Sequence, residues 1–196
     1  MAEVLVLVEL NPAGGGVRKT TLEALTAARA LGEPSAVVAG APGSAAGARD
    51  ALAEYGAQKV YVAESDEIEN HLVAPKAEVL AQLVAEKSPA AVVIPSSPEG
   101  KEVAARLAVK TNSGFLTDVT EITADGTATQ VAFAGATIVH SKVTAGIPIY
   151  TLRGNSVTPE PAPAAGTEQQ VTVSLSDSAK LARVVDRVVE QKSSRP

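Results

Sequence analysis

Residues 4–9 read VLVLVE, a run in which apolar and partly β-branched side chains follow one another almost without interruption. A strand with one wet face alternates apolar and polar side chains, so this strand requires apolar cover on both faces. Strands of this kind are typical of parallel sheets that carry helices on either side. The N-terminal run therefore favours an α/β domain.

The residues that follow supply the helix that such a strand needs. Leucine and alanine recur at helical spacing through 22–31, Thr20 or Thr21 is placed to cap this helix, and Gly32 is placed to end it. Further strands are expected at 36–39, 59–63 and 91–94, and further helices at 45–55, 71–87 and 99–110. Such alternation predicts right-handed crossovers and a parallel sheet.

The pattern changes after residue 115. Alternating side chains at 117–122 and 128–133 flank an Asp125-Gly126 pair, which is a strong signal for a tight hairpin. Further strands are expected at 138–143 and 147–153, and Pro148 suits the first residue or an edge of its strand. We expect a three-layer α/β/α fold, with a mostly parallel Rossmann-like sheet and antiparallel strands near one end.

The C-terminal part differs in composition. We assign residues 1–156 to the α/β domain and 157–170, with Pro159, Pro161 and Pro163, to an extended, weakly packed connector. Residues 171–196 form a tail in which 171–175 alternates like an edge strand. Within 181–188 the apolar residues fit helical spacing, whereas the four valines favour extended chain.

Composition limits the function. The net charge is -5, with 17 basic and 22 acidic residues, which argues against a nucleic acid partner. The sequence has no cysteine, so disulfides, thiolate metal ligands and thiol catalysis are excluded. The N-terminal residues lack the pattern of a signal peptide, and no apolar run approaches the roughly 20 residues of a membrane helix. We expect a cytoplasmic protein without direct membrane insertion.

A glycine-rich loop is the first candidate site. Gly14, Gly15 and Gly16 join the first strand to the first helix, where backbone amides can bind a phosphate. The spacing fits neither common motif, because a GxGxxG starting at Gly14 would require glycine at Lys19, and a P-loop requires glycine directly before that lysine. A surface loop is the favoured interpretation, and nucleotide binding is the alternative.

Ser96 and Ser97 are the second candidate, because they follow a central strand at the edge where open α/β sheets bind ligands. Capping of the helix that begins at Pro98 explains one of the two hydroxyls without any ligand, and we favour it. Both serines remain candidates for an adenine-nucleotide site.

Residues suited to catalysis or metal binding are sparse. His71 and His140 are far apart, and neither has a partner at metal-ligand spacing. Asp118 and Glu121 are three residues apart, which on a regular strand places them on opposite faces. The sequence has no GxSxG motif. We expect no catalytic residue and no metal, and an unrecognised hydrolase is the weakest hypothesis.

Four segments carry a family resemblance. They read TLEALTAARALG at 21–32, EYGAQKVYVAES at 54–65, GKEVAARLAVKTNSGFLTDVT at 100–120 and TLRGN at 151–155. In this order and spacing they resemble the N-terminal domain of electron transfer flavoprotein alpha subunits. The resemblance implies a scaffold that pairs with a beta subunit carrying AMP. It also implies that the complex transfers electrons from acyl-CoA dehydrogenases of fatty acid β-oxidation, and from other dehydrogenases, to a membrane quinone reductase.

The resemblance places FAD outside this sequence. Alpha subunits of this family hold FAD in a C-terminal domain, and none of its ligands can be carried over to residues 1–196, so FAD is not expected in this chain. The low aromatic content, two Phe and three Tyr, agrees with this view. We therefore expect a truncated or proteolysed subunit whose tail leads toward the flavin domain, with 181–188 extended. A free-standing adenine-nucleotide-binding module is the alternative.

Overall fold

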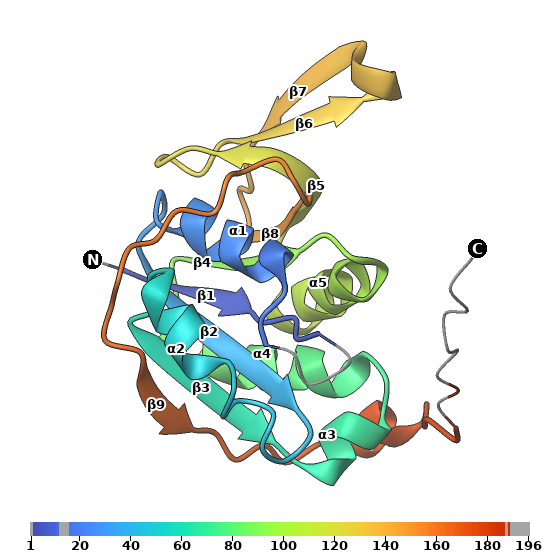
Figure 1. Ribbon diagram of the computed structural model, residues 1–196. Coiled ribbons are helices and arrows are strands. Elements are labelled where there is room, and N and C mark those ends of the chain that lie inside the picture. Colours follow the sequence, from blue (N-terminus) through green and yellow to red (C-terminus); the bar gives the residue numbers. More distant parts are fainter. Residues whose placement is uncertain (1, 12–15, 187, 189–196) are drawn as a thin grey trace, which may run out of the picture.

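A single mixed sheet organises the chain in the computed structural model, which describes residues 2–11, 16–186 and 188 (Figure 1). The order of the strands is β7-β6-β5-β8-β4-β1-β2-β3-β9. Their bounds are Glu3–Leu7 (β1), Glu33–Gly40 (β2), Lys59–Glu64 (β3), Ala91–Pro95 (β4), Phe115–Ile122 (β5), Ala128–Ala132 (β6), Thr137–Ser141 (β7), Ile149–Leu152 (β8) and Thr167–Gln170 (β9).

Helices cover both faces of this sheet, as expected. Val4 and Val6 of β1 pack on the side of α1 and α2, while Leu5 and Leu7 pack on the side of α3, α4 and α5. Both faces of β1 are therefore buried, and the three-layer arrangement is confirmed. The helices are Lys19–Ala28 (α1), Arg49–Glu54 (α2), Asp66–Asn70 (α3), Ala74–Lys87 (α4) and Pro98–Thr111 (α5), with 3-10 turns at Phe133–Gly135 (η1) and Asp177–Lys180 (η2).

The antiparallel strands also lie where the sequence places them. β5 and β6 pair antiparallel around Asp125-Gly126, and β6 pairs antiparallel with β7. Gly126 has a φ of 84°, and the Asp125 carboxylate accepts hydrogen bonds from the Thr123 hydroxyl and the Thr127 amide. These contacts fix the tight turn, which is why the local signal predicts it well.

Several element boundaries differ from the expectation. The helix expected at 71–87 begins later, at Ala74, as α4. A short helix that the sequence did not predict, α3, precedes it, and Ser65 caps α3 by accepting a hydrogen bond from the Ile68 amide at 3.1 Å. The helix expected at 45–55 is the shorter α2, and Thr20 and Thr21 lie inside α1, whose N-cap position is Arg18. Pro148 directly precedes β8, which is a central strand between β5 and β4 rather than an edge.

The proline-rich stretch follows the surface of the domain and ends in a strand. The amides of Ala162 and Ala164 donate to carbonyl groups of Glu54 and Ala53, at the end of α2. Residues 167–170, expected to be connector, form β9 and pair in parallel with β3 at the edge of the sheet. Figure 1 shows the path from β8 past α2 to β9. The stretch is hydrogen-bonded along its course and not simply extended.

The edge strand expected at 171–175 is wrong in position, since the strand ends at Gln170. Residues beyond it pack on the face that carries α4, where Leu175 and Ala179 are buried. Arg183 forms an isolated bridge with His71, so the described residues from 181 to 186 are partly extended and not helical. The rest of the expected extended segment, at 187 and 189–196, lies outside the described residues.

Gly100 explains why the first turn of α5 can approach β4 so closely. A Cβ built at this position would lie 2.0 Å from the Pro95 carbonyl oxygen and 3.0 Å from an Ile94 methyl group. Real atoms do not approach so closely, and the Pro95 carbonyl belongs to the backbone, so it cannot rotate away as a side chain can. Glycine is therefore required by the packing of α5 on the sheet.

We predict that Gly100→Ala lowers the free energy of unfolding by about 3 kcal/mol, the upper range for overpacking of a well-packed site. The matched control is Gly47→Ala, because a Cβ at Gly47 meets no atom within 4 Å. Urea denaturation of both variants tests this expectation. Equal stability of Gly100→Ala and the parent chain would contradict the packing argument.

Candidate functional site

The carboxyl ends of the parallel strands form the candidate site. β1 is followed in the sheet by β2 and β3 on one side and by β4 and β8 on the other, so the strand order reverses between β1 and β4. Open α/β sheets bind ligands at such a reversal. A cleft of about 760 Å³ lies there, and its lining includes Glu9, Asn11, Gly16, Gly40, Ser44 and Ser97.

Glu9 is one of the residues that line this cleft. Its side chain accepts hydrogen bonds from the hydroxyls of Thr20, at 3.2 Å, and Ser97. The Arg18 guanidinium lies 3.8 Å from the same carboxylate. Helix α1 begins beside it, so the donors that could bind a phosphate at the end of β1 already surround a negative charge of the chain itself.

Glu64 fills a second anion position, after β2. Its carboxylate accepts hydrogen bonds from the backbone amides of Gly43 at 2.9 Å and Ala45 at 2.6 Å, and from the Ser44 hydroxyl at 3.2 Å. Successive amides that converge on one point form a nest that suits an anion. Here that anion is a side chain, which reduces the capacity of the cleft for phosphate.

The structure brings together part of the predicted nucleotide site. Gly16 and Ser97 line the cleft, whereas Gly14 and Gly15 lie outside the described residues. Ser97 caps α5 as expected, accepting from the Gly100 amide at 2.9 Å. Ser96 lines a neighbouring cavity of about 400 Å³ and points toward Asp118.

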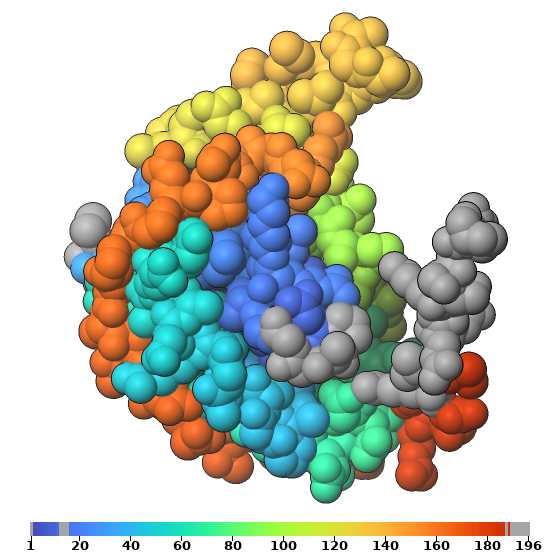
Figure 2. Space-filling model, in the orientation of Figure 1, coloured from blue at the N-terminus to red at the C-terminus, as the bar shows by residue number. Residues whose placement is uncertain are grey.

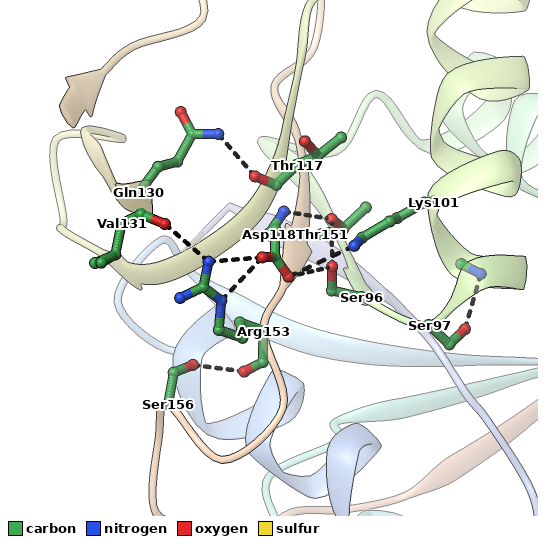
Figure 3. Close-up of polar contacts among 11 residues, drawn as sticks. Ser96, Ser97, Lys101, Thr117, Asp118, Gln130, Val131, Thr151, Arg153 and Ser156 are labelled. Atoms are coloured by element: carbon green, nitrogen blue, oxygen red, sulfur yellow. Dashed lines mark hydrogen bonds and ion pairs between the residues drawn. The ribbon is translucent and has the colours of Figure 1, made fainter. Parts of the chain in front are cut away.

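Asp118 is the centre of a polar cluster that sequence reasoning missed (Figure 3). One carboxylate oxygen accepts hydrogen bonds from two nitrogens of Arg153, Nε at 2.9 Å and Nη2 at 2.7 Å. The other accepts from the Ser96 hydroxyl at 3.0 Å and lies 3.7 Å from Lys101 Nζ. The Asp118 amide donates to the Thr151 hydroxyl at 2.8 Å. The cluster joins β5, β8, helix α5 and the residues that directly follow β4 and β8.

A bulge in β5 creates the geometry. The register between β5 and β8 shifts between Leu116 and Val119, and Asp118 has a φ of 56°. Asp118 and Glu121 were expected on a regular strand, but the left-handed conformation breaks the alternation. Arg153 also donates to the Val131 carbonyl at 3.1 Å, and Gln130 Nε2 donates to the Thr117 carbonyl at 2.7 Å. The cluster thus joins the bulge to β6.

The electrostatics of Asp118 follow from these contacts. Hydrogen bonding to Arg153 is the main cause that lowers the pKa of the Asp118 carboxyl, burial opposes the shift, and Ser96 and Lys101 support it. The carboxylate therefore stays charged across the physiological range. A carboxylate with a lowered pKa that is hydrogen-bonded to an arginine is suited to holding strands together and is poorly suited to proton transfer.

A second buried group fixes the turn after β8. Glu23 of α1 is 1% exposed; its carboxylate lies 3.2 Å from Lys19 Nζ and accepts from the Asn155 amide at 2.9 Å. Lys19 Nζ also donates to the Asn155 side chain at 2.8 Å. Asn155 has a φ of 61°. The TLRGN segment is therefore held by Asp118 through Thr151 and Arg153, and at its last residue by Glu23 through Asn155.

The histidines do not converge. His71 follows α3, where its Nδ1 lies 2.7 Å from the Glu67 carbonyl, and His140 lies in β7 beside the Thr129 hydroxyl. Within the described ranges, no group of three or more His, Asp or Glu side chains is arranged to hold a metal ion. None of the helices within those ranges combines the length and apolarity needed to cross a membrane.

Comparisons with known proteins agree on one family. The profile of the electron transfer flavoprotein domain matches residues 4–178. The chain is 46% identical over 173 residues to the electron transfer flavoprotein subunit alpha of Mycobacterium tuberculosis and 42% identical to that of Mycobacterium leprae, covering 88% of this chain and 54% of each relative. It is 33% identical over 140 residues to the probable mitochondrial subunit alpha of Caenorhabditis elegans, covering 71% of this chain and 42% of that protein.

The chain thus spans about half the length of the curated relatives it matches. The profile match begins within β1 and ends within η2. The two residues that form the ion pair of the Asp118 cluster lie in segments that carry the resemblance. Asp118 lies in 100–120 and Arg153 lies in 151–155.

We predict that Asp118→Asn lowers the free energy of unfolding by about 1 kcal/mol near neutral pH, because charge-assisted hydrogen bonds to a half-exposed carboxylate are lost. Asparagine adopts the left-handed conformation readily, so the change removes charge without adding backbone strain. The control is Glu121→Gln on the same strand, whose exposed carboxylate makes a long hydrogen bond of 3.5 Å to Thr129.

The lowered pKa of Asp118 determines how the stability difference between the parent chain and Asp118→Asn changes with pH. Because folding lowers the pKa of Asp118, its contribution is present above the usual carboxyl pKa of 3.8 and is lost as the pH falls toward and through the lowered pKa. The difference between the parent chain and Asp118→Asn, measured by urea denaturation, should shrink in acid. A difference that is unchanged or larger in acid would contradict this assignment.

Proposed function

The chain belongs to the electron transfer flavoprotein domain family, and on this premise we propose that it is the N-terminal scaffold of an alpha subunit that pairs with a beta subunit. In this proposal its task is positioning: it holds the partner so that a flavin bound elsewhere in the complex lies within transfer distance of electron donors. We infer that no residue of this chain acts as a catalyst, and we place the protein in the cytoplasm.

The observation that carries the proposal is the extent of the family match, which runs from β1 to η2. The site geometry supports it. Glu9 and Glu64 place carboxylates where a nucleotide-binding sheet needs to receive phosphate, and the Asp118 cluster uses its charges to tie strands together. Each of these arrangements suits a rigid scaffold.

The electron route is part of the proposal. We propose that FAD is held by the part of the subunit that the relatives have and this chain does not match, and that AMP is held by the beta subunit. Electrons would then pass from acyl-CoA dehydrogenases and other dehydrogenases to FAD, and from FAD to a membrane quinone reductase.

A free-standing adenine-nucleotide-binding module is the second candidate. The cleft between β1 and β4 favours it, because Gly16 and Ser97 line a volume of about 760 Å³ at the reversal of strand order. The charges of the lining argue against it. Arg18 and Lys76, two cationic residues of the cleft, already pair with Glu9 and Glu99 and so are not available to a phosphate alone.

We predict that this chain and the beta subunit encoded in the same genome form a one-to-one complex when they are co-expressed. Size-exclusion chromatography with native mass spectrometry tests this. The purified chain alone is expected to show no flavin absorption bands. Near-stoichiometric flavin in the isolated chain, or two components that elute separately, would contradict the scaffold proposal.

We predict no thermal shift of the isolated chain with millimolar AMP or ATP, because the anion positions hold Glu9 and Glu64. Differential scanning fluorimetry with inorganic phosphate as the reference measures this. A saturable upward shift with AMP that phosphate does not reproduce would favour the nucleotide-binding module instead.

A further inference from the structure

The strands β6 and β7 project from the body of the domain as an arm, here defined as residues 128–141 (Figures 1 and 2). β5 pairs with β6 through Ala128, Thr129 and Gln130. β6 continues to Ala132, and the pairing with β7 extends to Ala132 and Thr137. The outer part of the arm is therefore a two-stranded ribbon without a third strand beside it.

Apolar side chains are exposed on this ribbon. Phe133 is 81% exposed, Ile138 is 63% exposed and Val139 is 39% exposed. Ile138 and Val139 are consecutive residues of β7, opposite Val131 and Gln130, so their side chains lie on opposite faces of the ribbon. An isolated two-stranded ribbon is marginally stable in water, and this one places apolar surface in solvent on both faces.

The arm also lacks the charges that protect exposed strand edges. No Asp, Glu, Lys or Arg occurs from Gly126 to Ser141, although 20% of the whole sequence is charged. Natural edge strands are usually guarded by lysine, proline or other devices against pairing with other chains. Depletion of charge together with exposed aromatic and aliphatic residues is instead typical of the core of an interface.

The base of the arm is held firmly. Asp125 and Lys142, which flank the uncharged stretch, form an ion pair at 3.4 Å. Arg153 donates to the Val131 carbonyl and Gln130 donates to the Thr117 carbonyl, so the Asp118 cluster orients β6. At the tip, Phe133 and Ala134 have φ values of 50° and 53°, a conformation that non-glycine residues adopt at a cost. The arm therefore projects from a base that several contacts hold, and it leaves Phe133 and Ile138 exposed.

We propose that this arm is the docking surface for the second subunit, and that it binds an uncharged, apolar strand edge of that subunit. The inference rests on the proposed pairing with a beta subunit. β7 forms one end of the sheet and offers an open backbone edge, so a strand of the partner can continue the sheet, while Phe133, Ile138 and Val139 enter apolar pockets beside it. A different chain is the expected occupant because the relatives are named as alpha subunits, which are parts of an assembly.

The experiment measures the affinity of the full chain for the beta subunit encoded in the same genome, by isothermal titration calorimetry. Ile138→Lys and Phe133→Asp place charges in the arm, and each should weaken binding roughly thirtyfold or more, the loss expected at a central interface anchor. The matched control is Val109→Lys on α5, because Val109 is 84% exposed and lies outside the arm. Its affinity should stay within about twofold of the parent value.

Folding is checked in the same variants. All three side chains are largely exposed, so thermal unfolding midpoints should match that of the parent chain. Parent-like affinity of both arm variants would overturn the docking proposal while leaving subunit pairing intact. Failure of the parent chain itself to bind would overturn the proposed function and this inference with it. Self-association of the parent chain that Ile138→Lys abolishes would assign the arm to a second copy and overturn the proposal.

Discussion

Burial of β1 on both faces is the constraint from which most of the structure follows. Alternate side chains of Glu3–Leu7 enter two separate apolar cores, and each core needs its own layer of helices. Because the neighbours β2 and β4 run parallel to β1, their connections must cross over the sheet, and helices form those crossovers. The reversal of strand order, and with it the cleft beside Glu9, is a consequence of covering both faces from one central strand.

Sequence patterns predicted this architecture well because each signal is local and repeated. The unbroken apolar run of β1, the helical spacing in α5 and the Asp125-Gly126 turn each depend on neighbouring residues alone. Boundaries were less predictable. The short helix α3 depends on the Ser65 cap, and β9 is a strand because β3 offers it a partner, although the alternation in the sequence starts later, at Val171.

The polar cluster could not be predicted from the sequence in the same way. The alternation at 117–122 predicts a regular strand at Asp118, and Arg153 lies 35 residues further on. The bulge that gives Asp118 a positive φ depends on the register between β5 and β8, which is a property of the assembled sheet. The same is true of Glu23, whose partner Asn155 is distant in sequence. A family resemblance in 100–120 and 151–155 marked these segments as related to the family without indicating that they touch.

The two ends of the sheet carry different kinds of surface. β7 lies at one end, with the exposed arm, and β9 lies at the other, followed by residues 171–180 packed over α4. Neighbouring strands are about 4.8 Å apart, so nine strands separate these ends by roughly 40 Å along an untwisted sheet. A molecule bound at the arm therefore leaves the β9 end uncovered unless it is as wide as the domain itself. The sheet acts as a spacer, and two different molecules can contact its ends at the same time without competing for the same residues.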